Sequence, residues 1–79
     1  MTPSNYLLLV QRCLTELFGV DTQDAQKMMK ELREHSHIEG MQSVDDLDKP
    51  FYIACDLARV VEVADEVVDA YIEMEKPYL

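Results

Sequence analysis

The feature that most constrains the fold is an apolar repeat in the last third of the chain. Its members recur at alternating steps of four and three residues, a heptad pattern typical of a helix that packs against another helix. They are Ile53, Leu57, Val60, Ala64, Val67, Tyr71 and Met74, which we call the apolar seam. Pro50 is tolerated only in the first turn of a helix. The pattern therefore predicts one long helix over residues 49–76, about 40 Å in length at 1.5 Å per residue.

Such a helix is too long for the rest of the chain to cover. A 79-residue monomer has an expected radius of gyration of about 12 Å. With the flanking valines and alanines, the apolar arc is about 200° wide, roughly twice the stripe of an ordinary surface helix. We expect a homodimer in which self-association involves Val60, Val67, Tyr71 and Met74. A closed bundle, in which the first helices grip the long helix from two sides, is the alternative.

The opposite side of the predicted long helix is acidic. Five carboxylates gather there, and we call them the acidic ridge: Glu62, Asp65, Glu66, Asp69 and Glu73. Most ridges of this kind are simply solvated helix faces. The alternative is that the ridge is a docking surface for a basic partner protein. We therefore take these five residues as the candidate partner-binding site.

Two shorter helices are expected in the first half of the chain. The first covers about residues 4–18, with Ser4 as its cap and Gly19 as its left-handed terminating residue. The second covers about residues 22–35, with Asp21 as its cap and an apolar stripe that includes Ala25 and Met29. The short connection predicts an antiparallel helical hairpin.

A short helical turn over residues 43–48, begun by Ser43, should connect the hairpin to the long helix. The fold class is therefore all-α: one domain over residues 1–79, a small helical bundle with a hairpin, a short turn and one long C-terminal helix. The chain has only two glycines, and 48% of its residues are hydrophobic, which is typical of a folded helical protein.

Charge limits the classes of partner. The chain has a net charge of −9, and residues 41–79 contribute −7 of it. Direct binding to nucleic acid needs a basic surface, so we expect none. The longest N-terminal apolar run is five residues, too short for a membrane span or a secretory signal. We expect a cytoplasmic protein with free thiols at Cys13 and Cys55.

No catalytic or metal-binding pattern is present. His35 and His37 lie beside Glu34 and Glu39, but their spacing matches no zinc motif. There is no phosphate-binding glycine loop and no local signature of a catalytic triad. We expect a non-enzymatic protein without a metal or other cofactor.

Two alternatives remain open. The segment GMQSVDDLD, Gly40 to Asp48, resembles the part of acyl carrier proteins in which a serine at the start of an acidic helix receives phosphopantetheine. The resemblance implies modification at Ser43, although Gln42 and Val44 replace the family's aspartate and leucine. Separately, basic residues on the second helix would fit a helix-turn-helix regulator. They are Lys27, Lys30 and Arg33.

The function that these patterns favour is a small acidic protein that binds another protein and modulates or inhibits it. Proteins of this composition are frequent among phage- and plasmid-encoded host modulators, including anti-restriction and anti-CRISPR proteins and mimics of nucleic acid. The expected partner is a protein with a basic surface.

Overall fold

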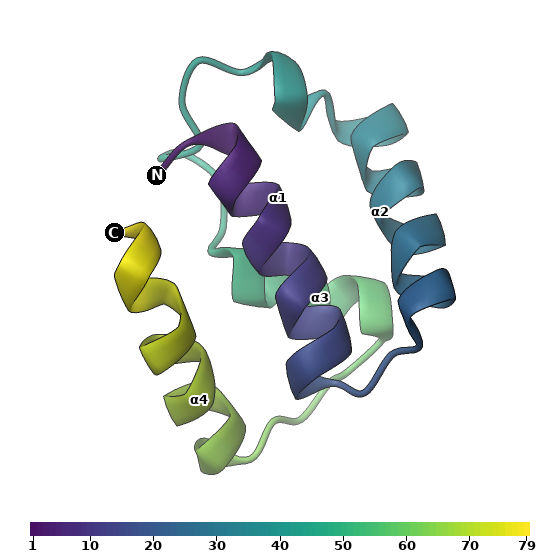
Figure 1. The fold of residues 1–79 in the computed structure, drawn as a ribbon, viewed down its shortest axis with the longest axis vertical. Coiled ribbons are helices and arrows are strands. Elements are labelled where there is room, and N and C mark those ends of the chain that lie inside the picture. Colours follow the sequence, from purple (N-terminus) through teal and green to yellow (C-terminus); the bar gives the residue numbers. More distant parts are fainter.

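The computed structural model describes residues 1–79 and contains helices and loops but no strands, which confirms the all-α fold class (Figure 1). Its four α-helices are α1 (Pro3–Arg12), α2 (Thr22–Ser36), α3 (Pro50–Ala58) and α4 (Asp65–Glu75). A π-helical segment, Cys13–Leu17, extends α1, and two 3-10 turns lie at Ile38–Gly40 and Lys76–Tyr78. In Figure 1, α1 lies in front of α3, with α2 on one side and α4 on the other.

The first helix begins at Pro3, one residue earlier than predicted, and its cap lies two residues earlier. Thr2, not Ser4, is the N-cap: its Oγ1 accepts a hydrogen bond from the Asn5 amide at 3.1 Å, and Pro3 occupies the first turn. Pro3 fits there because its missing N–H needs no partner. At the other end Gly19 has a φ of 65°, which confirms the predicted left-handed stop.

The second helix follows the sequence prediction closely. Asp21 is its N-cap and accepts a hydrogen bond from the Gln23 amide at 3.3 Å. Ala25 and Met29 are fully buried, as the apolar stripe predicts. The helix ends at His37, which adopts the left-handed conformation with a φ of 57°.

No helical turn forms over residues 43–48, contrary to the prediction. The segment is a loop in which the Ser43 hydroxyl accepts a hydrogen bond from the Asp45 amide at 3.2 Å. A single turn closes between the Val44 carbonyl and the Leu47 amide at 3.1 Å. The helical turn that does form in this connection lies earlier, at Ile38–Gly40.

The largest correction concerns the predicted long helix, which the structure divides in two. The first part, α3, ends at Ala58, and Arg59 caps it in the left-handed conformation with a φ of 57°. The amides of Arg59 and Val60 turn back to the carbonyls of Asp56 and Cys55, as in a Schellman motif. An irregular linker, residues 59–64, then leads to α4.

The physical reason for this break is partly local and partly global. Val60, Val61 and Val63 are β-branched and favour helix less than straight-chain residues do. Asp65 and Glu66 suit the positive end of a new helix. A straight helix of about 40 Å would exceed the longest dimension of the folded protein, 32 Å. Folding α4 back instead buries Tyr71 in the core.

The core surrounds α1. Its fully buried members include Tyr6 and Val10 from α1 and Cys13 and Leu14 from the π-helical segment that extends it. Phe51 of α3 packs against Tyr71 of α4 with ring centroids 5.0 Å apart. The radius of gyration, 11.8 Å, agrees with the value expected for a compact monomer of this length.

Candidate functional site

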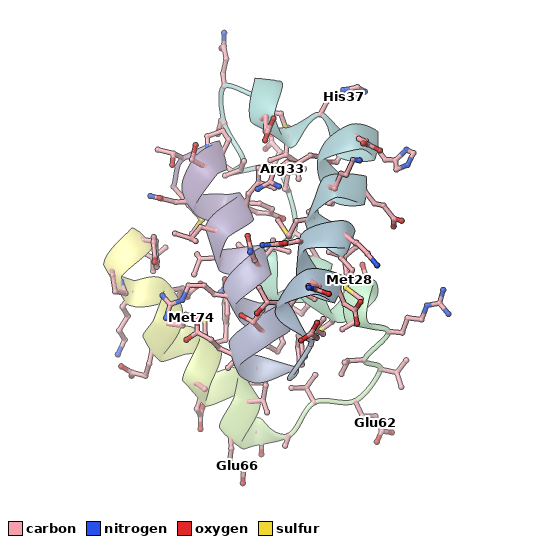
Figure 2. All side chains as sticks on the ribbon, turned by 45° about the vertical axis from the view of Figure 1, so that its right-hand side comes forward. Met28, Arg33, His37, Glu62, Glu66 and Met74 are labelled. Carbon is pink, nitrogen blue, oxygen red and sulfur yellow. The ribbon has the colours of Figure 1, made fainter.

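The acidic ridge lies on two different elements. Glu62 is on the linker, and the other four carboxylates follow on α4, beginning with Asp65 and Glu66 in its first turn. All five side chains are exposed. Figure 2 shows Glu62 and Glu66 projecting away from the rest of the molecule. The ridge is therefore not one straight helix face, because the linker turns the chain between its first two members.

Most of these carboxylates have no cationic partner. The protein has five ion pairs, and Glu73 takes part in one of them with Lys76, at 2.7 Å. Glu62, Asp65, Glu66 and Asp69 take part in none. Asp56, on the exposed side of α3, is likewise unpaired. Five carboxylates at this end of the protein are thus uncompensated.

An apolar groove lies between α3, the linker and α4, and we call it the α3–α4 groove. Its volume is about 570 Å³, and nine of its eleven lining residues are hydrophobic. The lining residues are Lys49, Phe51, Tyr52, Cys55, Asp56, Val60, Val61, Val63, Val68, Tyr71 and Ile72. Sequence reasoning missed this groove because it read the segment as one helix. The valine run followed by an acidic pair was the signal for a break.

Different contacts connect α3 and α4 at the two ends of the groove. At one end, the linker joins the last residue of α3 to the first of α4. At the other end, Lys49 and Glu75 form an ion pair at 3.9 Å. Phe51 and Tyr71 pack together between the two helices. These contacts fix the spacing of α3 and α4.

Three of the four residues predicted for self-association pack within the chain. Tyr71 is 2% exposed, and Val67 and Met74 pack against the same core. Val60 lies on the linker and lines the α3–α4 groove. The break after α3 explains this, because α4 folds back onto the bundle instead of extending beyond it. The apolar seam therefore has a partner inside the molecule.

The hydroxyl of Tyr71 is buried without a hydrogen-bond partner. Burial is the main cause that raises its pKa, and the nearby Glu75 carboxylate adds to the effect. Tyr6, equally buried, differs: its hydroxyl donates to the Asp48 carbonyl, and its pKa is raised to about 12 by burial and by Asp48.

Both cysteines are free and buried. Burial, followed by the proximity of Cys55, raises the pKa of the Cys13 thiol to about 12. Burial and Asp56 also raise the pKa of Cys55. A thiol reacts as its thiolate, so neither position has the chemistry of a nucleophile.

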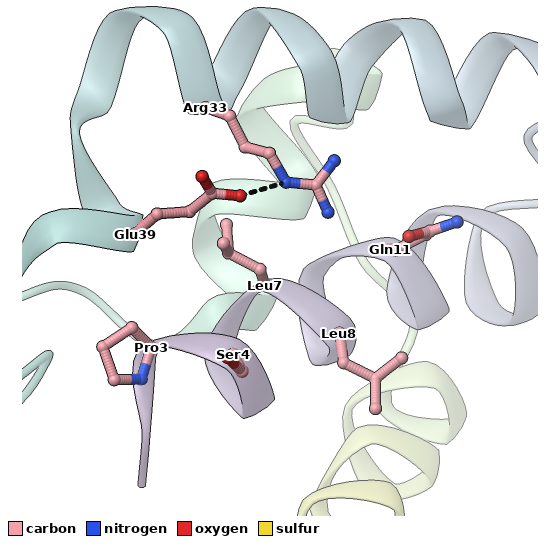
Figure 3. A pocket seen from close by; sticks show the side chains of 7 residues that line it. All are labelled: Pro3, Ser4, Leu7, Leu8, Gln11, Arg33 and Glu39. Atoms are coloured by element: carbon pink, nitrogen blue, oxygen red, sulfur yellow. Dashed lines mark ion pairs between the residues drawn. The ribbon is translucent and has the colours of Figure 1, made fainter.

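The basic residues of α2 are largely neutralised. Arg33 pairs with Glu39 at 3.0 Å, and Lys30 lies 4.0 Å from Glu34. Figure 3 shows the Arg33–Glu39 pair above Leu7, at the side of a hollow of about 340 Å³ between α1 and α2. Lys27 is exposed and unpaired. Two of the three cations thus have a carboxylate of the same chain beside them.

The remaining candidate residues lie apart from this end of the protein. His35 and His37 are exposed, and no cluster of three metal-ligating side chains occurs in the structure. Ser43 is exposed on its loop, and the next helix begins only at Pro50. None of the helices combines the length and apolar character needed to cross a lipid bilayer.

Comparison with known proteins adds no relative. No protein-family model matches the chain, and no curated protein or solved structure matches it significantly.

Proposed function

We propose that the protein is a non-enzymatic, acidic protein-binding module that recognises a basic surface on another protein and modulates or inhibits that protein. The observation that carries the proposal is the group of five unpaired carboxylates at the α3–α4 end. Residues 49–76 hold seven carboxylates and three cations, a net charge of −4. Two of these cations are already engaged, Lys49 with Glu75 and Lys76 with Glu73.

Uncompensated charge of one sign raises the rate of encounter with an oppositely charged surface and repels nucleic acid. A protein whose own ligand is a nucleic acid presents such a basic surface. The proposed class is therefore that of host modulators encoded by phages or plasmids, with the acidic end standing in for a nucleic-acid ligand.

The experiment is capture of partners from a lysate of the source organism or its host by the purified chain. The double variant Glu66→Lys/Asp69→Lys should lose the captured protein, whereas Asp24→Lys/Glu34→Lys on α2 changes the net charge equally and should retain it. Capture by the wild type should also weaken as salt increases. Equal capture by both double variants, or capture independent of salt, would refute the acidic-surface proposal.

Self-association stays a separate prediction. The exposed apolar surface that motivated it is smaller than expected, since α4 covers its seam with the chain's own core. Sedimentation distinguishes the two states: a homodimer has a mass of about 18 kDa, twice the 9.1 kDa of one chain. A mass of 9.1 kDa at all concentrations would remove the dimer.

The two alternatives gain no specific support from the site. Modification of Ser43 would need recognition of a loop that no helix follows at once. DNA binding by α2 would rest on Lys27 alone. Intact mass after incubation with a phosphopantetheinyl transferase would show a mass increase only for a carrier protein.

A further inference from the structure

The exposed apolar side chains of this protein are concentrated in one place. Six large hydrophobic residues are exposed in the whole structure, and four of them line the α3–α4 groove. These four are Tyr52, Val61, Val68 and Ile72, which are 57%, 96%, 37% and 42% exposed. Exposed apolar surface that gathers in a groove is typical of an interaction site. The groove is therefore the surface whose occupant is worth identifying.

The groove is built before any partner arrives. Phe51 and Tyr71 pack between its walls, and the Lys49–Glu75 pair closes the end opposite the linker. The left-handed Arg59 ends α3 and turns the linker away from the α3 axis. If α3 and α4 joined into one straight helix, the side chains of α4 would have to leave the core. A fixed groove loses little conformational entropy on binding.

Backbone hydrogen bonding favours a helix as the occupant. The backbone groups along α3 and α4 are paired within each helix, so these two walls offer no strand edge, and only the short linker lies outside a helix. An extended segment along α3 and α4 would leave its own N–H and C=O groups unpaired there, whereas a helix satisfies them internally. The eleven residues of α4 span about 16 Å, enough to contact three turns of a partner helix.

Carboxylates flank the apolar lining on each wall. Asp56 lines the groove from α3, and Glu62 lies between Val61 and Val63 on the linker. On α4, Asp65 and Asp69 are one turn apart, and each lies three residues before an apolar residue of the groove, Val68 and Ile72 respectively. None of these four carboxylates is in an ion pair, and Arg59 is the one cation on the linker.

This charge pattern selects among the occupants. A second copy of the chain would bring the same carboxylates together, which is unfavourable. A small apolar molecule would leave them without a partner. A helix with Lys or Arg beside its apolar face would pair with them.

We propose that the α3–α4 groove binds one amphipathic helix of the partner protein, about three turns long, with its apolar face in the groove and its Lys or Arg side chains against Asp56, Glu62, Asp65 and Asp69. This inference rests on the proposed function and specifies the partner's recognition element. It is separable from that function, since a basic surface without such a helix would also satisfy the acidic end.

The probes are three synthetic peptides of equal length. The first is an amphipathic helix with leucines at three- and four-residue spacing and flanking lysines. The second has the same composition with the leucines spread around the helix, and the third replaces the lysines of the first with glutamates. Binding to the full chain is measured by fluorescence anisotropy and by amide chemical shifts in NMR. We expect the first peptide to bind at least about tenfold more tightly than either other peptide, with shifts at Tyr52, Val68 and Ile72.

Matched variants test the position of the site. Ile72→Gln should weaken binding of the first peptide about tenfold, whereas Leu8→Gln on α1 should leave it unchanged. The two residues are 42% and 44% exposed, so they are equivalent apart from their location. Val61→Gln, on the linker and 96% exposed, should weaken binding without risk to the core.

The following results would contradict parts of the proposal. Equal binding of the first two peptides, or binding unaffected by Ile72→Gln and Val61→Gln, would contradict the proposal that the groove binds the helix. The proposal of a partner with a basic surface would not be affected. Equal binding of the lysine and glutamate peptides would overturn the charge selection. If a long-chain fatty acid displaced the first peptide at a concentration below that of the peptide, the groove would be assigned to a small apolar ligand. Concentration-dependent shifts in the groove without peptide would assign it to a second copy.

Discussion

Replacing Tyr71 by phenylalanine should make the protein more stable. The substitution removes one oxygen from a side chain that is 2% exposed and leaves the aromatic ring against Phe51. The lost hydroxyl is buried and has no hydrogen-bond partner in the folded state. In the unfolded chain the same hydroxyl is hydrated. Folding therefore removes its hydrogen bonds to water and forms no others in their place, which destabilises the folded state.

The magnitude follows from that desolvation. A buried polar group without a partner costs about 1–3 kcal/mol. Removing an oxygen also leaves a small void, so we expect a net gain of about 1 kcal/mol. Unfolding entropy is about 2.1 cal/mol/K per residue, or about 170 cal/mol/K for this chain, which converts the gain to an increase in Tm of about 6 °C.

Tyr6→Phe is the matched control. Tyr6 is also 2% exposed, but its hydroxyl donates a hydrogen bond to the Asp48 carbonyl. Its loss leaves that carbonyl without this donor and should lower the free energy of unfolding by about 1 kcal/mol. The two substitutions remove the same atom and are expected to have opposite signs.

Thermal and urea unfolding, followed by circular dichroism at 222 nm and pH 7, measure both effects. The urea m-value should be the same for the wild type and the two variants, because each exposes the same surface on unfolding. A lower Tm for Tyr71→Phe would refute the reasoning. It would mean that the native hydroxyl is hydrogen-bonded, to Glu75 or to a bound water.

Three further substitutions test other parts of the fold. Arg59→Gly should raise the free energy of unfolding in urea by about 0.5–1 kcal/mol, because relief of the left-handed conformation exceeds glycine's added entropy loss; an unchanged or lower value would exclude strain at this helix end. Asp21→Ala should lower it by about 1 kcal/mol through loss of the α2 cap, and wild-type stability would show that the cap is unimportant. The Cys13 thiol has its pKa raised from 9.0 to about 12 in the folded state, so the unfolded chain loses this proton first and stability present below pH 9 should be lost towards pH 12. The free energy of unfolding should fall with pH by up to about 1.4 kcal/mol per pH unit in the wild type, and by less in Cys13→Ala. Equal pH slopes of the two proteins, measured by urea unfolding from pH 8.5 to 10, would contradict this prediction.

Much of the first half of the fold follows from local sequence signals. Gly19 and Asp21 end one helix and begin the next because each acts through its own backbone or side chain within a few residues. Burial of Tyr6, Val10, Ala25 and Met29 follows from helical periodicity, which needs no knowledge of the partner element. Charge is also a property of the sequence, and it predicts exposed carboxylates at positions 62–73.

Only the tertiary structure decided what happens after Ala58. The heptad repeat through the valine run is compatible with one helix of about 40 Å, and no glycine or proline interrupts it. The valine run weakens the helix locally, but a break there still costs helix hydrogen bonds and a left-handed Arg59. It is favoured because α4 can then bury Tyr71 beside Phe51. That gain depends on α1 and α3, which are distant in sequence. The same folding back divides the acidic ridge between linker and helix and opens the α3–α4 groove. The valine run and the acidic pair mark where the chain breaks, but the groove itself is a consequence of packing.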